Sequence, residues 1–145
     1  MLNRILAICL ISSLTSLGYG QAFDQRLIDY FGVDHLLHLQ LEAPNVLEYH
    51  KYYLDNVTVV QTARGKDVSN FPDVSGIPVK SGLVAIVPIE DQITNNSFNP
   101  FLFDLGQNES SYNYYKIGSS GKILAILPRK IFYERYNVFR GALHE

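Results

Sequence analysis

Two residue types are scarce in this 145-residue chain, which contains one cysteine and no tryptophan. A single cysteine cannot form an internal disulfide or a cysteine-based zinc cluster. Charged residues make up only 18% of the chain, below the roughly 25% of typical soluble domains. The 12 basic and 14 acidic residues leave no basic excess for a phosphate backbone, so we expect no nucleic-acid partner.

Hydrophobic residues are not scarce, since they reach 47% of the chain. This content excludes a disordered, collagen-like or low-complexity protein. The length fits one domain with its own core.

The first twenty residues have the pattern of a secretory signal peptide. Arg4 precedes an uncharged stretch whose most apolar part is residues 5–11, followed by several serines and threonines. An uncleaved membrane anchor is the alternative, but the strongly apolar run is only about a dozen residues, whereas a membrane span needs about 20.

Small residues mark the expected end of this segment. Gly18 and Gly20 have the spacing of a cleavage site, as do Gly20 and Ala22. Cleavage between Gly20 and Gln21 is preferred to cleavage before Phe23. Cleavage removes Cys9 with the signal and leaves a cysteine-free domain, residues 21–145. The protein is therefore expected to be periplasmic or secreted, with no membrane span after cleavage.

Hydrophobic periodicity predicts short helices at both ends of this domain. Apolar residues recur at helical spacing in residues 23–31, and Gly32 supplies a stop. Further short helices are predicted over residues 34–41 and 44–56. After Pro128, residues 131–143 combine an apolar stripe with a polar side, which predicts a closing amphipathic helix.

Between these helices the pattern changes to that of strands. The predicted strands are residues 57–62, 83–87, 101–105, 112–117 and 122–127. The first alternates between the two faces and should have one solvent-facing side, whereas residues 83–87 are apolar throughout and should be covered on both faces. The last two are joined by residues 118–121, whose glycines and serines predict a hairpin turn. The second strand of this hairpin is almost wholly apolar and therefore central.

Residues 64–82 are expected to form a long loop with at most short extended pieces, because Gly and Pro interrupt every longer pattern. Together the segments predict an α+β fold. We expect an antiparallel meander sheet of four to five strands, with short N-terminal helices and the C-terminal amphipathic helix packed on it.

Three histidines could in principle offer imidazoles to a metal. His35 and His38 are three residues apart on a predicted helix, and His50 lies on the next one. His38 is surrounded by leucines, so a histidine at a packing interface is the preferred interpretation, and no metal or cofactor is expected.

Two short motifs resemble catalytic ones by chance. Residues 119–122 match S-x-x-K, but they fall in a hairpin turn rather than at the start of a helix. Residues 112–116 match Y-x-x-x-K without the glycine-rich loop of a dinucleotide site. The adjacent carboxylates Glu90 and Asp91 point apart if extended, so they do not form a recognisable catalytic pair.

Tyrosine is the one residue type that suggests a binding surface. Tyr112, Tyr114 and Lys116 should share one face of a strand, and Tyr49 and Tyr52 lie on the third helix. Tyrosine suits interfaces because its ring buries apolar surface while its hydroxyl keeps a hydrogen bond with water. The same property suits the edge of a hydrophobic core.

These observations favour a small exported protein that acts as a non-catalytic binding or accessory component of the cell envelope. Its partner would be an envelope or extracellular protein. Two alternatives stay open: a small secreted hydrolase whose site is assembled from dispersed loops, with His50 or His35 as base, and a purely structural envelope protein.

Overall fold

The computed structural model describes residues 22–65 and 67–143, so the predicted signal peptide and its cleavage site lie outside the described residues. The described part combines helices with an antiparallel sheet, which confirms a mixed α and β fold. The helices are α2 (Gln25–Phe31), α3 (Val33–Glu42), α4 (Pro44–Asn56), α5 (Ile89–Thr94) and α6 (Arg129–Leu143), and the strands are β1 (Thr58–Thr62), β2 (Asn113–Lys116) and β3 (Lys122–Ile126). Two short 3-10 turns, η1 (Val74–Gly76) and η2 (Pro100–Leu102), lie between them.

The three N-terminal helices form where their local sequence predicts. Asp24 caps α2, because its side chain accepts a hydrogen bond from the Arg26 N–H. Gly32 ends α2 and precedes α3, and Pro44 occupies the first turn of α4, where no N–H is needed. The second helix starts one residue before the predicted Asp34 and ends one residue after the predicted Leu41.

The sheet in the described residues has three strands, so the predicted count of four to five is wrong. Its order is β1-β3-β2, with both pairs antiparallel. The predicted hairpin is confirmed as β2 and β3, and β3 is central as expected. β1 pairs with β3 rather than with the next strand along the chain, so the arrangement is not the predicted meander.

Two predicted strands are absent from the described sheet. Residues 83–87 form neither helix nor strand, and all of their side chains except that of the half-buried Ala85 are exposed, with Val84 at 79% and Ile86 at 93%. An apolar run reports a preference for burial, but it does not specify a partner strand, and β3 already has a neighbour on each side.

The predicted strand over residues 101–105 is replaced at its start by the 3-10 turn η2. The side chain of Asn99 caps this turn by accepting a hydrogen bond from the Phe101 N–H. Only one bridge, between Val79 and Phe103, pairs this segment with another. Phe101 and Phe103 are nevertheless buried, as the prediction of core aromatic residues required. Between residues 83–87 and this segment, Ile89–Thr94 forms the short helix α5, which the sequence did not predict.

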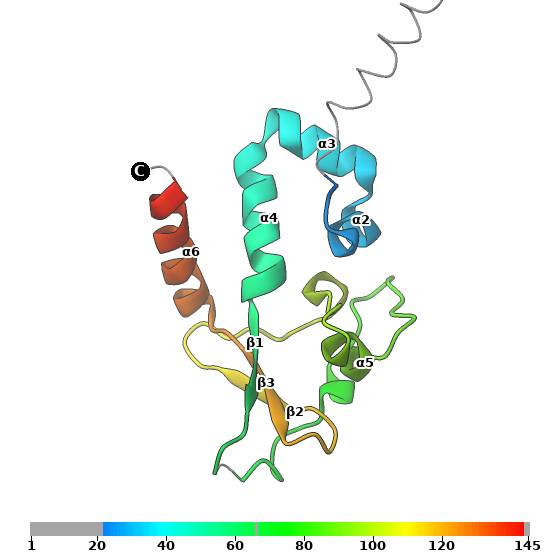
Figure 1. Cartoon of the computed structure of the whole chain (residues 1–145), viewed down its shortest axis with the longest axis vertical. Helices are drawn as coiled ribbons and strands as arrows, with labels where there is room; N and C mark the ends of the chain where they lie inside the picture. The colour runs from blue at the N-terminus through cyan, green and yellow to red at the C-terminus, as the bar shows by residue number, and fades with distance from the viewer. Residues whose placement is uncertain (1–21, 66, 144–145) are drawn as a thin grey trace, which may run out of the picture.

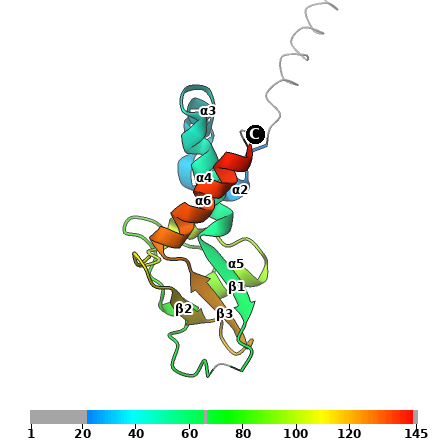
Figure 2. The same cartoon turned by 90° about the vertical axis from the view of Figure 1, so that its left-hand side faces the viewer.

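The closing helix is confirmed, but most of it extends beyond the sheet instead of packing on the sheet as predicted. Figures 1 and 2 show α6 continuing upward from β3 and running beside α4, which continues downward into β1. Phe132 and Tyr136 are buried, whereas Phe139 and Leu143 at the far end are exposed. The predicted apolar stripe is therefore fully buried only in its first half, although Phe139 still contacts Tyr52, with ring centroids 4.8 Å apart.

The buried side chains form two clusters. One joins the sheet to α5, α6 and the loops, and includes Val57, Leu124 and Phe132. The other lies among α2, α3 and α4, and it takes Phe101 from η2. Tyr53 packs against both clusters. The 64–82 segment has only short ordered pieces among its described residues, as predicted: η1 and isolated bridges at Asp73 and Val79.

Candidate functional site

The two outer edges of the sheet differ in how they are covered. Along β2, the Lys116 N–H donates to the Pro72 carbonyl at 2.9 Å, and Asp73 forms a parallel bridge with Lys116. The Asp73 carboxylate also accepts from the Gly118 N–H at 3.1 Å. The 72–73 segment therefore occupies one end of the β2 edge.

The opposite edge, along β1, is open. Leu127 N–H donates to the Val57 carbonyl, and Ala63 N–H donates to the Gly121 carbonyl. Because hydrogen bonds alternate along an antiparallel pair, Val59 and Gln61 direct their backbone groups toward β3. The backbone groups of Thr58 and Val60 then point away from the sheet, and no other segment of the described chain forms a backbone ladder with them.

The side chains of β1 do not protect this edge. Its sequence, Thr-Val-Val-Gln-Thr, has no charge and no proline, although natural sheets commonly use lysine, proline or bulges to prevent pairing at an edge. Val59 is 40% exposed and Val60 is 46% exposed, and they lie on opposite faces of the strand. β1 therefore has the properties of a strand that accepts another strand.

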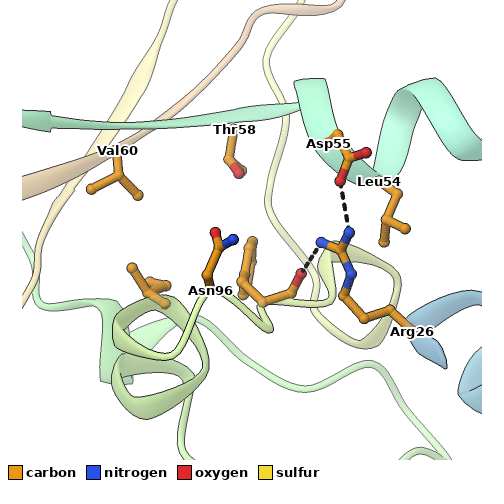
Figure 3. Close-up of a pocket in the computed structure, with 8 residues that line it drawn as sticks. Arg26, Leu54, Asp55, Thr58, Val60 and Asn96 are labelled. Carbon is orange, nitrogen blue, oxygen red and sulfur yellow. Dashed lines mark hydrogen bonds and ion pairs between the residues drawn. The ribbon is translucent and has the colours of Figure 1, made fainter. Parts of the chain in front are cut away.

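A hollow of about 230 Å³ lies beside this edge (Figure 3). Thr58 and Val60 form its wall on the β1 side, and Asn96 lies across from them. The remaining lining residues are Arg26, Leu54, Asp55, Ile93 and Phe98. A strand added to β1 would place alternate side chains on the same face as Thr58 and Val60, and hence toward this hollow.

One end of the hollow is closed by a salt-bridge network around Arg26. Its Nη2 lies 2.7 Å from an Asp55 carboxylate oxygen and 2.8 Å from Asp24, and its Nη1 donates to the Phe98 carbonyl at 3.1 Å. The hydrogen bond from Arg26 lowers the pKa of the Asp24 carboxyl, and the same bond raises the pKa of Arg26. The guanidinium is held by these partners, so it acts as a wall and not as a free anion site.

Asn96 supplies a polar group on the other side. It follows α5 with a positive φ of 55°, a conformation that asparagine tolerates better than most residues. Its backbone N–H donates to the Ile93 carbonyl at 3.2 Å, while its amide points into the hollow (Figure 3). The amide offers both a donor and an acceptor to an incoming group.

The predicted tyrosine residues fall into two separate groups. Tyr112 and Tyr114 lie on or next to β2, where their rings stack at 5.8 Å with an angle of 12°. Tyr114 also stacks on Phe71 at 5.6 Å. Lys116 ends the same strand. Because the three rings lie against one another, their faces are partly covered within the protein.

Tyr49 and Tyr52 lie elsewhere, in the contact between α4 and α6. Tyr49 meets Tyr136 edge-on at 5.3 Å, and Tyr52 lies 5.5 Å from Phe132 and 4.8 Å from Phe139. Burial, followed by a hydrogen bond with Tyr133, raises the pKa of Tyr49. These two tyrosines pack the helices together, and the structure does not bring them to the β2 tyrosines.

The histidines also lie away from the hollow. His35 stacks on Phe31 with ring centroids 5.6 Å apart, and the His50 ring lies tilted against Phe31 at 4.5 Å. Burial lowers the pKa of His50, and the nearby His35 lowers it further. His38 is exposed. Within residues 22–65 and 67–143, no group of three or more His, Cys, Asp or Glu side chains could hold a metal ion.

Sequence reasoning identified β1 but missed its role as an open edge. The absence of charge from Thr58 to Thr62 was the available signal, and the two asparagines at 95–96 marked a polar turn. No pattern in the sequence could place Arg26, Asp55 and Asn96 around one hollow. None of the helices in the described residues is long and apolar enough to cross a membrane.

The chain matches no protein-family model, and no curated protein and no solved structure is similar to it at a significant level.

Proposed function

We propose that this chain is a non-catalytic binding module whose β1 edge receives an extended segment of a partner protein. The observation that supports the proposal most strongly is the open, uncharged edge of β1 with a hollow along one face. Peptide recognition by strand addition uses main-chain hydrogen bonds for affinity and pockets for alternate side chains for specificity.

The chemistry of the partner segment follows from the edge. Thr58 and Val60 each offer an outward N–H and carbonyl, and each hydrogen bond formed there contributes about 0.5–1.5 kcal/mol net. Val60 and Ile93 favour an aliphatic side chain in the hollow, and Asn96 favours a neighbouring polar group. The expected ligand is thus a short, uncharged, extended peptide segment rich in aliphatic residues.

The setting in which this binding occurs is part of the same proposal. The signal-like segment at the N-terminus supports export to the periplasm or beyond, so the partner would be an envelope or extracellular protein. The β2 tyrosines Tyr112 and Tyr114, with Lys116, stay a prediction for a second contact surface, independent of β1.

The proposal is tested by selecting peptides from a displayed library for binding to the purified protein. The affinity of each selected peptide is then measured by titration. We expect selected peptides to be uncharged and to bind at least tenfold more weakly to Val60→Lys, because the ammonium group would stand in the hollow. The control is Val138→Lys, the same substitution at an exposed valine of α6. This variant should bind the selected peptides with unchanged affinity.

A second control replaces both Tyr112 and Tyr114 by Ala, and we expect it to leave peptide affinity unchanged. Equal affinity for Val60→Lys and the unsubstituted protein, or failure of any peptide to bind, would contradict a peptide site at β1.

A further inference from the structure

A second unpaired segment is present in the same molecule, in the loop before α5. Residues 83–87, Leu-Val-Ala-Ile-Val, carry no charge and are exposed except for the half-buried Ala85. The exposed fractions are largest at Val84 and Ile86, which are two residues apart. Isolated apolar side chains on a surface are ordinary, but a continuous exposed apolar run marks an interaction site.

The backbone of this segment is also unpaired. Leu83 N–H donates to the Lys80 carbonyl, and the Val87 carbonyl accepts from the Gln92 side chain. The N–H groups from Val84 to Val87 have no hydrogen-bond partner among the described residues. The segment can therefore become extended on docking without breaking a ladder in its own chain.

We infer that residues 83–87 of one molecule add as a strand to the β1 edge of a second copy. This inference rests on the proposed function of β1 and names the partner. Both segments have five residues, both lack charge, and both have backbone groups with no ladder partner. Val84 and Ile86 have the period-two spacing that matches Thr58 and Val60, the two residues of β1 that line the hollow.

The charges that flank the two segments select the direction of pairing. Lys80 precedes one segment and Glu90 follows it, while Asp55 precedes β1 and Arg64 follows it. Parallel alignment places Glu90 at the Arg64 end, and it places Lys80 at the end where the two carboxylates of Asp24 and Asp55 outnumber the one guanidinium of Arg26, so that opposite charges meet. Antiparallel alignment would bring like charges together at both ends, which is unfavourable.

Parallel alignment sets Val84 beside Thr58 and Ile86 beside Val60, with both apolar side chains facing the hollow. If each of two molecules donates its segment to the other, the assembly closes as a dimer; if not, it extends as a chain of molecules. Either form predicts association that requires β1 from one molecule and residues 83–87 from another.

A mixing experiment separates this arrangement from all others. The full chain, purified as the cell produces it, is compared by sedimentation velocity with Val60→Lys and with Ile86→Lys. Val60→Lys damages only the acceptor edge, and Ile86→Lys damages only the donor segment. Leu41→Lys, on the exposed side of α3, is the matched control, and circular dichroism checks that each variant is folded.

We expect the unsubstituted protein and Leu41→Lys to associate, and each single variant to lose association by itself. A mixture of the two variants should associate again, because intact residues 83–87 of Val60→Lys can add to intact β1 of Ile86→Lys. In a Cys9→Ser background, Thr58→Cys mixed with Val84→Cys should form an intermolecular disulfide, whereas Thr62→Cys mixed with Val84→Cys should not.

Three results would overturn the inference: an unsubstituted protein that stays monomeric, an Ile86→Lys variant that still associates, or a mixture that remains monomeric. If display peptides still bind β1 in any of these cases, the proposed function stands and only the partner is wrong. If Val60→Lys changes neither peptide binding nor association, both fail.

Discussion

At the scale of single residues, buried amides connect segments that are distant in sequence. Asn99 Nδ2 donates to the Arg26 carbonyl at 2.7 Å, and its Oδ1 accepts from the Phe101 N–H. Its own N–H donates to Gln92 Oε1, while Gln92 Nε2 donates to the Val87 carbonyl. These contacts hold α2 against the loop that follows α5, and so position two walls of the hollow.

Replacing Asn99 by Ala should cost about 1–3 kcal/mol of the free energy of unfolding, because it leaves buried backbone groups without partners. Urea denaturation measures this change. Asn137→Ala, on the exposed side of α6, is the control and should change stability by less than about 0.5 kcal/mol. An equal effect of both substitutions would contradict a structural role for the Asn99 amide.

His50 gives the fold a dependence on pH. Its Nδ1 is buried and has no hydrogen-bond partner in the described residues, and burial, followed by the charge of His35, lowers its pKa. The unfolded chain, where histidine has its ordinary pKa of about 6.5, then binds the proton first as pH falls. The stabilising effect of neutral His50 is complete above that value and is lost toward the lower folded pKa.

We therefore expect the free energy of unfolding to decrease as the pH falls below about 6.5, the ordinary pKa of histidine. His50→Phe keeps a ring between Phe31 and Phe101 and should flatten this part of the profile, whereas His38→Gln on the exposed side of α3 should not. Urea titrations at several pH values test this, and an unchanged slope in His50→Phe would contradict it.

At the scale of elements, local signals determine the helices and the turns between them. Gly32 joins α2 to α3 with φ of 77° and ψ of 153°, a region that only glycine enters without strain. Local sequence also explains the β2–β3 hairpin and the start of α4. It does not explain residues 83–87, whose apolar pattern is that of a strand but which pair with no other segment in the described part of the chain.

Gly32→Ala should destabilise the protein by about 1–3 kcal/mol through backbone strain alone, since a Cβ there meets no atom within 4 Å. Gly141→Ala, in α6, also meets no atom within 4 Å and has no positive φ. It should instead stabilise by about 0.5–1 kcal/mol because alanine is the better helix former. Thermal denaturation of the two variants distinguishes backbone strain from steric crowding. A similar change of melting temperature in both variants would contradict the strain argument.

At the scale of the whole molecule, Phe101 couples the two buried clusters. Its ring lies 5.2 Å from Tyr30, 5.1 Å from Phe31 and 5.0 Å from Tyr53. Tyr53 in turn contacts Phe132, 5.5 Å away, in the cluster below the helices. A residue from the middle of the chain thus closes the core formed by its first three described helices.

Phe101→Ala should cost about 3–5 kcal/mol, the usual range for truncating a buried aromatic residue. The lost contacts belong to the N-terminal helices. The rate of backbone amide hydrogen exchange, measured by mass spectrometry, should therefore increase more in α2 and α3 than in β3. Val138→Ala, at a strongly exposed position of α6, is the control and should have a much smaller effect. Uniform acceleration over all elements would show that Phe101 does not act locally on the helices.

The sequence by itself determined the helices at the two ends of the domain, the β2–β3 hairpin, and the mixed α and β class, but not the short helix α5. These features depend on caps, glycines and periodicities within a few residues of each other, as at Asp24, Gly32 and Pro44. Only the tertiary structure decided that the sheet has three strands in the described residues, that β1 is an open edge there, and that Arg26 and Asn96 flank a hollow beside it. An open sheet edge or a hollow depends on which segments distant in sequence pack against each other. Sequence patterns within a few residues do not specify such long-range contacts.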